Sequence, residues 1–343
     1  MYRYQGKQVG LALLVTALFV RLLQTVFAAP DPARTGDLIW QAAAMAAGTQ
    51  IPGNESPAEA NLWVVRTVPL AAEKQDKPAE EPEPLPTEPL PVPLTFTKGE
   101  AEAIPIGGAC TYTPDKTALL LRQASAAASA DGPTVLIVHT HTSEAYTQSA
   151  GWFYEESDRL RTLQPEHSVV RVGAEIAQVL ESAGIGVIHD TSYNDYPDYN
   201  GSYTRTGEKI KTWLTQYPTL QVVLDVHRDA VENADGSPRR DAVTLSDGRK
   251  SARLMLVVGT DQGGTHHPNW QENLSLAMKT HALVERAEPG LCRNIDLRTE
   301  RFNQHLSPGC LLVEVGSTGN TMPEALAAGG VFAEALAKLL LSP

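Results

Sequence analysis

Three segments of the sequence place histidine or carboxylate side chains at the ends of short apolar runs. The run Thr134–Val138 leads directly into His139-Thr-His-Thr-Ser-Glu144, and the run Gln221–Val226 leads into His227-Arg-Asp229. A third apolar run carries Glu314 near its end. A catalytic zinc ion uses three nitrogen, oxygen or sulfur ligands from the protein and keeps one position open for water. The three segments therefore predict a zinc site, provided that their ends meet in the folded chain.

Within these segments, His141 and His227 are the better candidates for imidazole ligands. His139 and His141 alternate onto the same side of an extended chain, and His141 has the more loop-like position. Glu144 offers a carboxylate three residues beyond His141. Glu314 comes from a different strand, so it can face the open position and take a proton from water. A single histidine at a strand end is more often structural, so the prediction depends on the combination.

The chain after Ile106 alternates predicted strands with predicted helices. Apolar, β-branched runs predict strands at Thr134–Val138, Ile185–Ile188, Gln221–Val226, Leu254–Val258 and Leu311–Val315. Helical periodicity predicts helices at Val169–Ser182, Tyr203–Gln216, Trp270–Glu288 and Pro323–Leu341. This alternation is typical of an α/β fold with an open, mainly parallel, twisted sheet and helices on both faces. In such sheets the active site forms at the carboxyl ends of the strands, where the candidate residues lie.

The amino terminus predicts a segment that enters the membrane. Arg3 and Lys7 precede a long apolar run, which is typical of an export signal over residues 1–29. Ala28 suits cleavage by signal peptidase, whereas Arg21 lies off-centre and can snorkel, so an uncleaved single-pass anchor is also compatible with the sequence. Both readings place the rest of the chain outside the cytoplasm.

Residues 30–105 lack the apolar pattern of a packed core. Proline and glutamate recur from about residue 70 to residue 105, which favours an extended, polyproline-like spacer. The catalytic domain is then predicted to span residues 106–343.

The composition argues against two classes of site. The chain has 28 Lys and Arg against 40 Asp and Glu, a net charge of -12, which speaks against a nucleic-acid partner. Its 3 cysteines are too few and too scattered for a disulfide scaffold or a Cys-rich zinc site, although one bridge could form outside the cell.

Six longer motifs of the sequence resemble stage II sporulation protein P. In chain order they are His139-Thr-His-Thr-Ser-Glu-Ala-Tyr146, Val-Ile-His189-Asp190, Asp225-Val-His-Arg-Asp-Ala230, His267-Pro-Asn-Trp-Gln-Glu-Asn273, Asn303-Gln-His-Leu-Ser-Pro-Gly309 and Leu-Val-Glu314-Val-Gly-Ser-Thr-Gly-Asn320. The resemblance extends from about Pro133 to the C-terminus. It implies an amidase-like fold and a relative of the zinc-dependent N-acetylmuramoyl-L-alanine amidases.

The resemblance implies Zn2+ as the cofactor, with His141 and His227 as ligands and Glu314 as the catalytic carboxylate. The remaining ligand has two candidates. Glu144 lies within the most distinctive motif, whereas amidases usually bring this carboxylate from the start of the first helix, where Glu166 stands. A further group of residues, Arg228, Asn303 and His305, is predicted to contact the substrate.

The resemblance also implies a substrate, a place and partners. It implies an enzyme that removes stem peptides from peptidoglycan and can also cleave peptide cross-links. The enzyme would be held at the cell membrane, with its catalytic domain between mother cell and forespore, and would act during engulfment beside stage II sporulation proteins D and M. Two other functions fit the same residues: an envelope zinc peptidase or deacetylase, and a wall-binding module without catalysis.

Overall fold

A computed structural model describes residues 94–342 of the chain. Within these residues, a 7-stranded sheet has the strand order β1-β8-β7-β9-β4-β2-β3. Neighbouring strands are parallel throughout except for β7 and β9, which pair antiparallel. The predicted mainly parallel α/β sheet is therefore confirmed, and the predicted leader 1–29 lies outside the described residues.

The strands of this sheet are β1 (Ile106–Gly107), β2 (Val135–Val138), β3 (Val187–His189), β4 (Val222–Asp229), β7 (Leu254–Gly259), β8 (Ile295–Arg298) and β9 (Cys310–Ser317). A separate antiparallel hairpin is formed by β5 (Ala242–Thr244) and β6 (Lys250–Ala252). The helices are α3 (Lys98–Ala103), α4 (Lys116–Leu121), α5 (Val169–Ser182), α6 (Ser202–Gln216), α7 (Trp270–Ala287) and α8 (Met322–Leu340), with short 3-10 helices η1 (Pro165–His167) and η2 (Gln304–Leu306).

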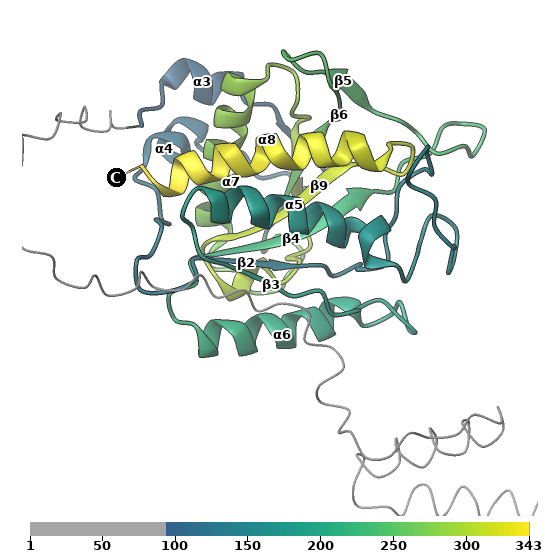
Figure 1. The fold of residues 1–343 in the computed structure, drawn as a ribbon. Helices are drawn as coiled ribbons and strands as arrows, with labels where there is room; N and C mark the ends of the chain where they lie inside the picture. Colours follow the sequence, from purple (N-terminus) through teal and green to yellow (C-terminus); the bar gives the residue numbers. More distant parts are fainter. Residues whose placement is uncertain (1–93, 343) are drawn as a thin grey trace, which may run out of the picture. The chain divides into compact units, whose positions relative to one another are not determined.

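Helices cover both faces of the sheet. Figure 1 shows α5, α7 and α8 on one face, with α6 on the other face next to β2 and β3. Successive side chains of a strand point to opposite faces. Val135 and Ile137 of β2 therefore join the larger apolar core, while Leu136 and Val138 join the smaller core with Ile210 of α6. This double burial explains why β2 is an uninterrupted apolar run.

Helix α5 approaches the sheet closely at one glycine. A Cβ atom on Gly173 would lie 2.7 Å from the ring of His139 and 2.8 Å from the ring of His189. A side chain at this position would displace His139, which follows β2, and His189, the last residue of β3. The glycine therefore sets how closely α5 can pack beside the candidate site.

The predicted helices and strands are present, with ends that differ by at most three residues. The sequence did not predict β1, β8 or the hairpin of β5 and β6. These strands are short, and Ile-Asp-Leu-Arg of β8 alternates apolar with charged residues instead of forming an apolar run. The edge of the sheet beyond β7 therefore emerges only from the tertiary structure.

The folded part begins earlier than the sequence predicted. Helix α3 starts with a capping box formed by Thr97 and Glu100, and it buries Ala101 and Ile104 in the core. Glu100 also forms an ion pair with Arg286 of α7 at 2.6 Å. The structure therefore places residues 94–105 with the folded part, whereas composition assigned them to the spacer. The physical reason is that apolar residues with core spacing resume once the Pro- and Glu-rich stretch has ended.

Two further features concern the membrane and the cysteines. None of the helices between residues 94 and 342 is long and apolar enough to cross a membrane. Cys110, Cys292 and Cys310 are all free, so the structure contains no bridge among them.

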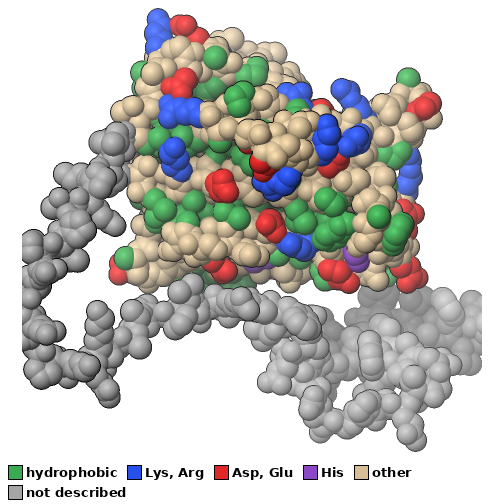
Figure 2. All heavy atoms as spheres, turned by 45° about the horizontal axis from the view of Figure 1, so that its top comes forward, with side chains coloured by type: hydrophobic (Ala, Val, Ile, Leu, Met, Phe, Trp, Pro, Cys, Tyr) green, Lys and Arg blue, Asp and Glu red, His purple; other side chains and the backbone are tan. Residues whose placement is uncertain are grey.

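One face of the folded part, shown in Figure 2, carries mixed charge. On the face in Figure 2, Lys and Arg side chains lie interspersed with Asp and Glu side chains and with small apolar patches. A surface of this kind favours solubility over the binding of a polyanion.

Candidate active site

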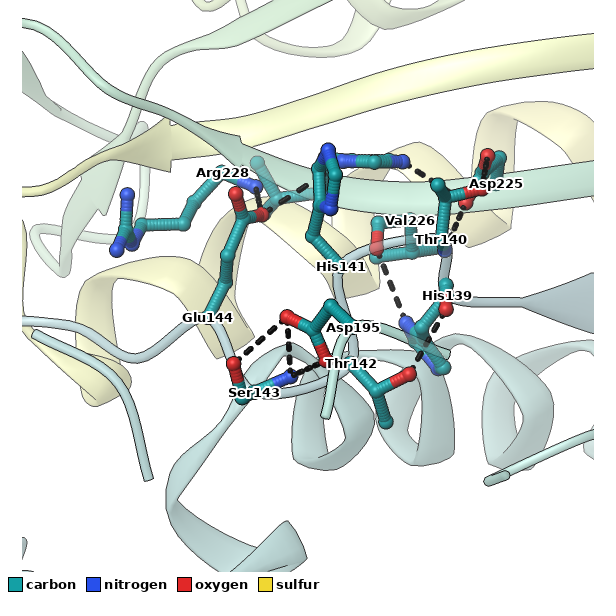
Figure 3. Close-up of polar contacts among 12 residues, drawn as sticks. His139, Thr140, His141, Thr142, Ser143, Glu144, Asp195, Asp225, Val226 and Arg228 are labelled. Atoms are coloured by element: carbon teal, nitrogen blue, oxygen red, sulfur yellow. Dashed lines mark hydrogen bonds and ion pairs between the residues drawn. The ribbon is translucent and has the colours of Figure 1, made fainter. Parts of the chain in front are cut away.

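One carboxylate fastens the loop after β2 to the neighbouring strand β4. Asp225 accepts hydrogen bonds from the backbone N–H of Thr140 at 2.8 Å and from its hydroxyl at 2.6 Å. Oδ1 of Asp225 also lies 2.8 Å from Nε2 of His227. Because Asp225 contacts both segments, it sets the position of the loop relative to His227. Figure 3 shows Asp225 next to Thr140 of this loop.

His141 lies in an aromatic enclosure beside His227. The centroids of the two imidazole rings are 5.2 Å apart, with the rings nearly perpendicular. The ring of Tyr199 stacks on His141 at 4.6 Å, and the ring of Tyr203 meets it edge-on at 5.5 Å. Burial lowers the pKa of His141. The imidazole is therefore neutral near pH 7, which is the form that binds a metal.

Glu144 and His227 form a buried pair of opposite charge. Nδ1 of His227 lies 3.6 Å from Oε2 of Glu144. Burial acts to raise the pKa of Glu144, but the contact with His227 and the charge of Arg228 outweigh it and hold that pKa at about 2. Burial acts to lower the pKa of His227, but Asp225 and Glu144 outweigh it and raise that pKa well above its usual range. Without a metal ion, His227 is therefore an imidazolium between two carboxylates.

A polar network holds the turn that carries Glu144. The backbone N–H and the hydroxyl of Ser143 both donate to Asp195, at 3.1 and 2.6 Å. Asp195 in turn pairs with Arg161 at 2.7 Å, and Arg161 lies 3.7 Å from Glu144. The guanidinium of Arg161 also lies 4.9 Å above the ring of Tyr199. Arg161 therefore supports both the turn that carries Glu144 and the ring of Tyr199 that stacks on His141.

Glu314 faces His227 from the adjacent strand. The two residues are direct partners in the pairing of β4 with β9. Oε2 of Glu314 is buried and has no hydrogen-bond partner. Burial, together with the charges of Glu144 and Asp229, raises the pKa of Glu314 to about 8. A carboxyl group in this state can hold a proton near neutral pH and release it to a base.

His141, His227 and Glu144 fit a zinc ion in their chemistry. Among residues 94–342, no three His, Cys, Asp or Glu side chains already stand in a metal-binding arrangement. However, Nδ1 of His141 is buried without a hydrogen-bond partner, and a metal ion would satisfy this atom. Two imidazoles and one carboxylate form a known ligand set of catalytic zinc. These residues could therefore hold zinc once their side chains rotate toward a common point.

His139 points away from this group and into the protein. Its Nδ1 lies 3.0 Å from the carbonyl oxygen of Val226, and its Nε2 lies 2.9 Å from Nε2 of His189. Burial lowers the pKa of His139 to about 4. The ring therefore acts as a buried hydrogen-bonding group between β2, β3 and β4, and His141 is the histidine of this motif that lies beside His227.

The comparison with protein families identifies the chain. The family model of stage II sporulation protein P matches residues 69–337. The chain belongs to this family. The stage II sporulation protein P of Bacillus subtilis (strain 168) is 29% identical over 219 residues, which cover 60% of this chain and 51% of that protein. The chain thus spans about half the length of this curated family member.

Two solved structures show a distant similarity to part of the chain. The N-acetylmuramyl-L-alanine amidase of Mycobacterium abscessus is 11% identical, with a TM-score of 0.36, and the match covers 61% of this chain and 97% of that chain. The corresponding amidase of Mycobacterium smegmatis is 8% identical, with a TM-score of 0.35, and covers 62% and 97%.

In this member of the stage II sporulation protein P family, Arg228 makes only inward contacts. Its Nε donates to the carbonyl oxygen of Ala145 at 2.5 Å, and its Nη2 donates to that of Leu160 at 2.8 Å. Its backbone N–H donates to Glu144 at 3.2 Å. These bonds help to position the loop that carries Glu144, and contact of Arg228 with substrate stays a prediction.

Asn303 and His305 brace a loop beside the site. Nδ2 of Asn303 donates to the carbonyl oxygen of Tyr203 at 2.7 Å, and the residue has a left-handed backbone with φ 61. The carbonyl oxygen of His305 accepts a hydrogen bond from Asn269 at 3.1 Å. Both contacts connect η2 to other elements, and contact of either side chain with substrate stays a prediction.

The two candidates for the carboxylate ligand lie in different surroundings. Glu144 is buried and contacts His227, whereas Glu166 is exposed on η1. Sequence analysis did not assign roles to Asp225, Asp195 or Arg161. The sequence could have indicated a structural role for Asp225, because a charged residue inside the buried apolar run Val-Val-Leu-Asp-Val needs a polar partner. No sequence pattern indicated the roles of Asp195 and Arg161, since their contacts join loops that are distant in the sequence.

A cleft of about 310 Å³ opens beside Glu314. Leu312 and Met255 contribute to its floor from β9 and β7, and Tyr203 and Phe302 also line it. Tyr203 therefore contacts both His141 and the cleft. The arrangement joins a potential reaction centre to a space that can receive a substrate.

Proposed function

We propose that this protein is a zinc-dependent hydrolase of peptidoglycan that cleaves the amide between N-acetylmuramic acid and L-alanine. Membership of the stage II sporulation protein P family supports a role in the cell wall during sporulation. The observation that carries the proposal is the pairing of His227 with Glu314 across β4 and β9. It sets a potential zinc ligand next to a half-buried carboxyl group, with one oxygen fully buried, that can act as acid and base.

The ligands would be His141, His227 and Glu144. If bound there, zinc would supply a Lewis acid for the scissile carbonyl group and would lower the pKa of a water molecule to about 7. A bound zinc ion would lower the raised pKa of Glu314, because a nearby positive charge favours the carboxylate. Glu314 could then accept the proton of the attacking water and pass it to the leaving amine. Burial raises its pKa to about 8, near that of a useful acid for the return of the proton to the leaving amine.

The products of hydrolysis test this proposal. Purified full-length protein with zinc, incubated with peptidoglycan, should release stem peptides and leave glycan strands without peptide, as measured by mass spectrometry. Glu314→Gln should lower the rate by about 100- to 10,000-fold because the amide has the same shape but accepts no proton. The matched control is Glu334→Gln, which alters an exposed carboxylate of α8 outside the candidate site and should leave the rate unchanged.

Other products would identify another function. Cleaved cross-links with intact muramoyl amides would make the protein a peptidase, and loss of acetyl groups alone would make it a deacetylase. Binding to peptidoglycan without any product, in the presence of zinc, would favour a wall-binding module. Any of these three results would contradict the amidase proposal.

We further propose that residues 1–29 hold the protein at the outer face of the cell membrane, between mother cell and forespore, beside stage II sporulation proteins D and M. Residues 70–93 would then act as a spacer of roughly 70 Å if extended like polyproline. Deleting residues 70–93 should leave hydrolysis of soluble fragments intact and impair engulfment in sporulating cells. Normal engulfment by this variant would argue against the tether.

A further inference from the structure

The cleft beside Glu314 extends across the sheet to Arg298 of β8. Paired residues on neighbouring strands face the same side of a sheet. Glu314 pairs with Met255 of β7, and Gly259, four residues further along β7, pairs with Arg298 of β8. Arg298 and Glu314 both line the cleft. With about 4.8 Å between strands and 3.3 Å per residue, their Cα atoms lie roughly 16 Å apart.

Aromatic side chains form a continuous wall between these two ends. The rings of His141 and Tyr203 are 5.5 Å apart, and the rings of Tyr203 and Phe302 are 5.7 Å apart. The guanidinium of Arg298 then lies 5.7 Å from the ring of Phe302. Phe302 has a backbone φ of 46, which non-glycine residues adopt rarely. An uncommon backbone conformation thus places this ring between Tyr203 and Arg298.

Arg298 keeps hydrogen-bonding capacity for a ligand. Its Nη1 lies 3.5 Å from Asp296 and its Nε lies 3.4 Å from Glu300, both long for charged hydrogen bonds. The Nε atom is buried and makes no hydrogen bond. The other arginine of the cleft differs, because Arg293 pairs with Asp229 at 2.6 Å. Arg298 is therefore the cleft arginine whose donors are least satisfied by the protein.

We propose that Arg298 binds a free carboxylate of the stem peptide and so determines which peptidoglycan the enzyme accepts. A guanidinium binds a carboxylate through two parallel hydrogen bonds, a geometry that a carboxamide or a hydroxyl does not reproduce. The side chains of Glu314 and Arg298 shorten the distance between their Cα atoms that a substrate has to span. The remaining distance suits an extended peptide of about three residues between the scissile amide and the bound carboxylate. This inference rests on the proposed amidase function, since it assumes that the scissile bond lies at Glu314.

Two soluble muropeptides that differ only in amidation of their stem-peptide carboxylates test the proposal. Full-length protein should hydrolyse the carboxylate form with a kcat/KM about 10- to 100-fold higher than the amidated form, with the difference mainly in KM. In Arg298→Gln this preference should disappear, because the carboxylate form slows while the amidated form does not. Arg298→Lys should restore part of it, since the charge returns without the paired donors. The matched control is Arg249→Gln, at an exposed arginine that pairs with Asp247 and does not line the cleft.

The ratio of the two substrates separates recognition from a structural effect. Loss of folding or of zinc would lower both rates together and leave their ratio unchanged, and this result would overturn the proposal. A wild-type protein without preference for the carboxylate form would overturn it as well. If wild-type protein hydrolyses neither muropeptide, the amidase function has failed, and calorimetric binding of the same two muropeptides then decides about Arg298. Equal binding of both forms by wild-type protein contradicts the proposal, and a preference that Arg298→Gln abolishes supports it.

Discussion

At the scale of single residues, the candidate site separates two carboxylates by their surroundings. Glu144 keeps its charge because His227 and Arg228 outweigh its burial, whereas burial raises the pKa of Glu314 to about 8. A charged carboxylate suits a metal ligand, and a carboxyl group that titrates near neutral pH suits an acid and base catalyst. The structure therefore provides a physical reason to assign different roles to two glutamates of the same site.

Zinc content tests the ligand assignment at this scale. His141→Ala and His227→Ala should each bind zinc at least about 10-fold more weakly than wild-type protein, because each loses one of three ligands. Glu144→Gln should behave likewise, while Glu166→Gln should keep full occupancy. Elemental analysis after dialysis against a weak chelator measures these differences. His266→Ala is the control, since this histidine is exposed, and full zinc occupancy in the two ligand variants would show that the site lies elsewhere.

The raised pKa of Glu314 predicts a pH-dependent stability of the zinc-free protein. The carboxyl group is protonated in the folded state up to about pH 8, but it ionises near its usual value of 4.5 when the chain unfolds. Below pH 4.5 the group is protonated in both states and does not destabilise the fold. As the pH rises from 4.5 toward 8, ionisation favours the unfolded chain, so the free energy of unfolding falls. Glu314→Gln removes this titration, so it should raise the melting temperature by roughly 3–8 °C at pH 8 relative to wild type, and by less at pH 5. Calorimetry of the two proteins in chelator, with Glu166→Gln as control, measures the difference, and an equal effect at both pH values would disprove the assignment.

At the scale of the elements, the site depends on how closely α5 packs on strands β2, β3 and β4. His139 and His189 form a buried pair at the ends of β2 and β3, directly under Gly173 of α5. His141 follows two residues later on the same loop. A shift of α5 therefore reaches the candidate zinc ligands through the His139 ring.

Two glycines within helices should respond to alanine in opposite ways. Gly173→Ala places a Cβ atom 2.7 Å from His139, and relief of this clash should cost about 1–3 kcal/mol of unfolding free energy and weaken zinc binding. Gly330→Ala in α8 has no atom within 4 Å of the new Cβ, so it should stabilise the protein by about 0.5–1 kcal/mol. Urea unfolding of the two variants measures both effects. A Gly173→Ala protein as stable as Gly330→Ala would mean that α5 does not pack as described.

At the scale of the whole molecule, the boundary of the folded part decides which fragments are stable. Phe96 packs against the core, with Arg286 of α7 4.9 Å above its ring. Ala101 and Ile104 are buried, and Ile106 pairs with β8. The segment from residue 94 onward therefore contributes packing that a spacer would lack.

Two truncations distinguish these descriptions. A fragment that begins at residue 94 should be soluble and should unfold cooperatively. A fragment that begins at residue 106 loses Phe96, Ala101 and Ile104, so its unfolding free energy should fall by about 2–5 kcal/mol relative to the first fragment. Chemical denaturation of both fragments measures the difference. Equal stability would restore the boundary at residue 105 that composition predicts.

Much of this protein follows from local sequence patterns. Hydrophobic periodicity located the long helices and the apolar strands, because a strand buried on both faces and an amphipathic helix leave signals within a few residues. The motifs around His141, His227 and Glu314 indicated the family and the candidate chemistry, since each lies where an apolar run ends. These conclusions require only short stretches of chain.

The tertiary structure decided what depends on contacts between distant segments. Strand β8 and helix α3 carry too few apolar residues for a pattern, and they become visible only through what they pair with or pack against. The antiparallel pairing of β7 with β9 brings Arg298 to the cleft of Glu314, and no spacing in the sequence encodes that neighbourhood. The charge states of Glu144, His227 and Glu314 likewise arise from burial and from partners far along the chain, because a pKa depends on the surrounding field and not on the residue type alone.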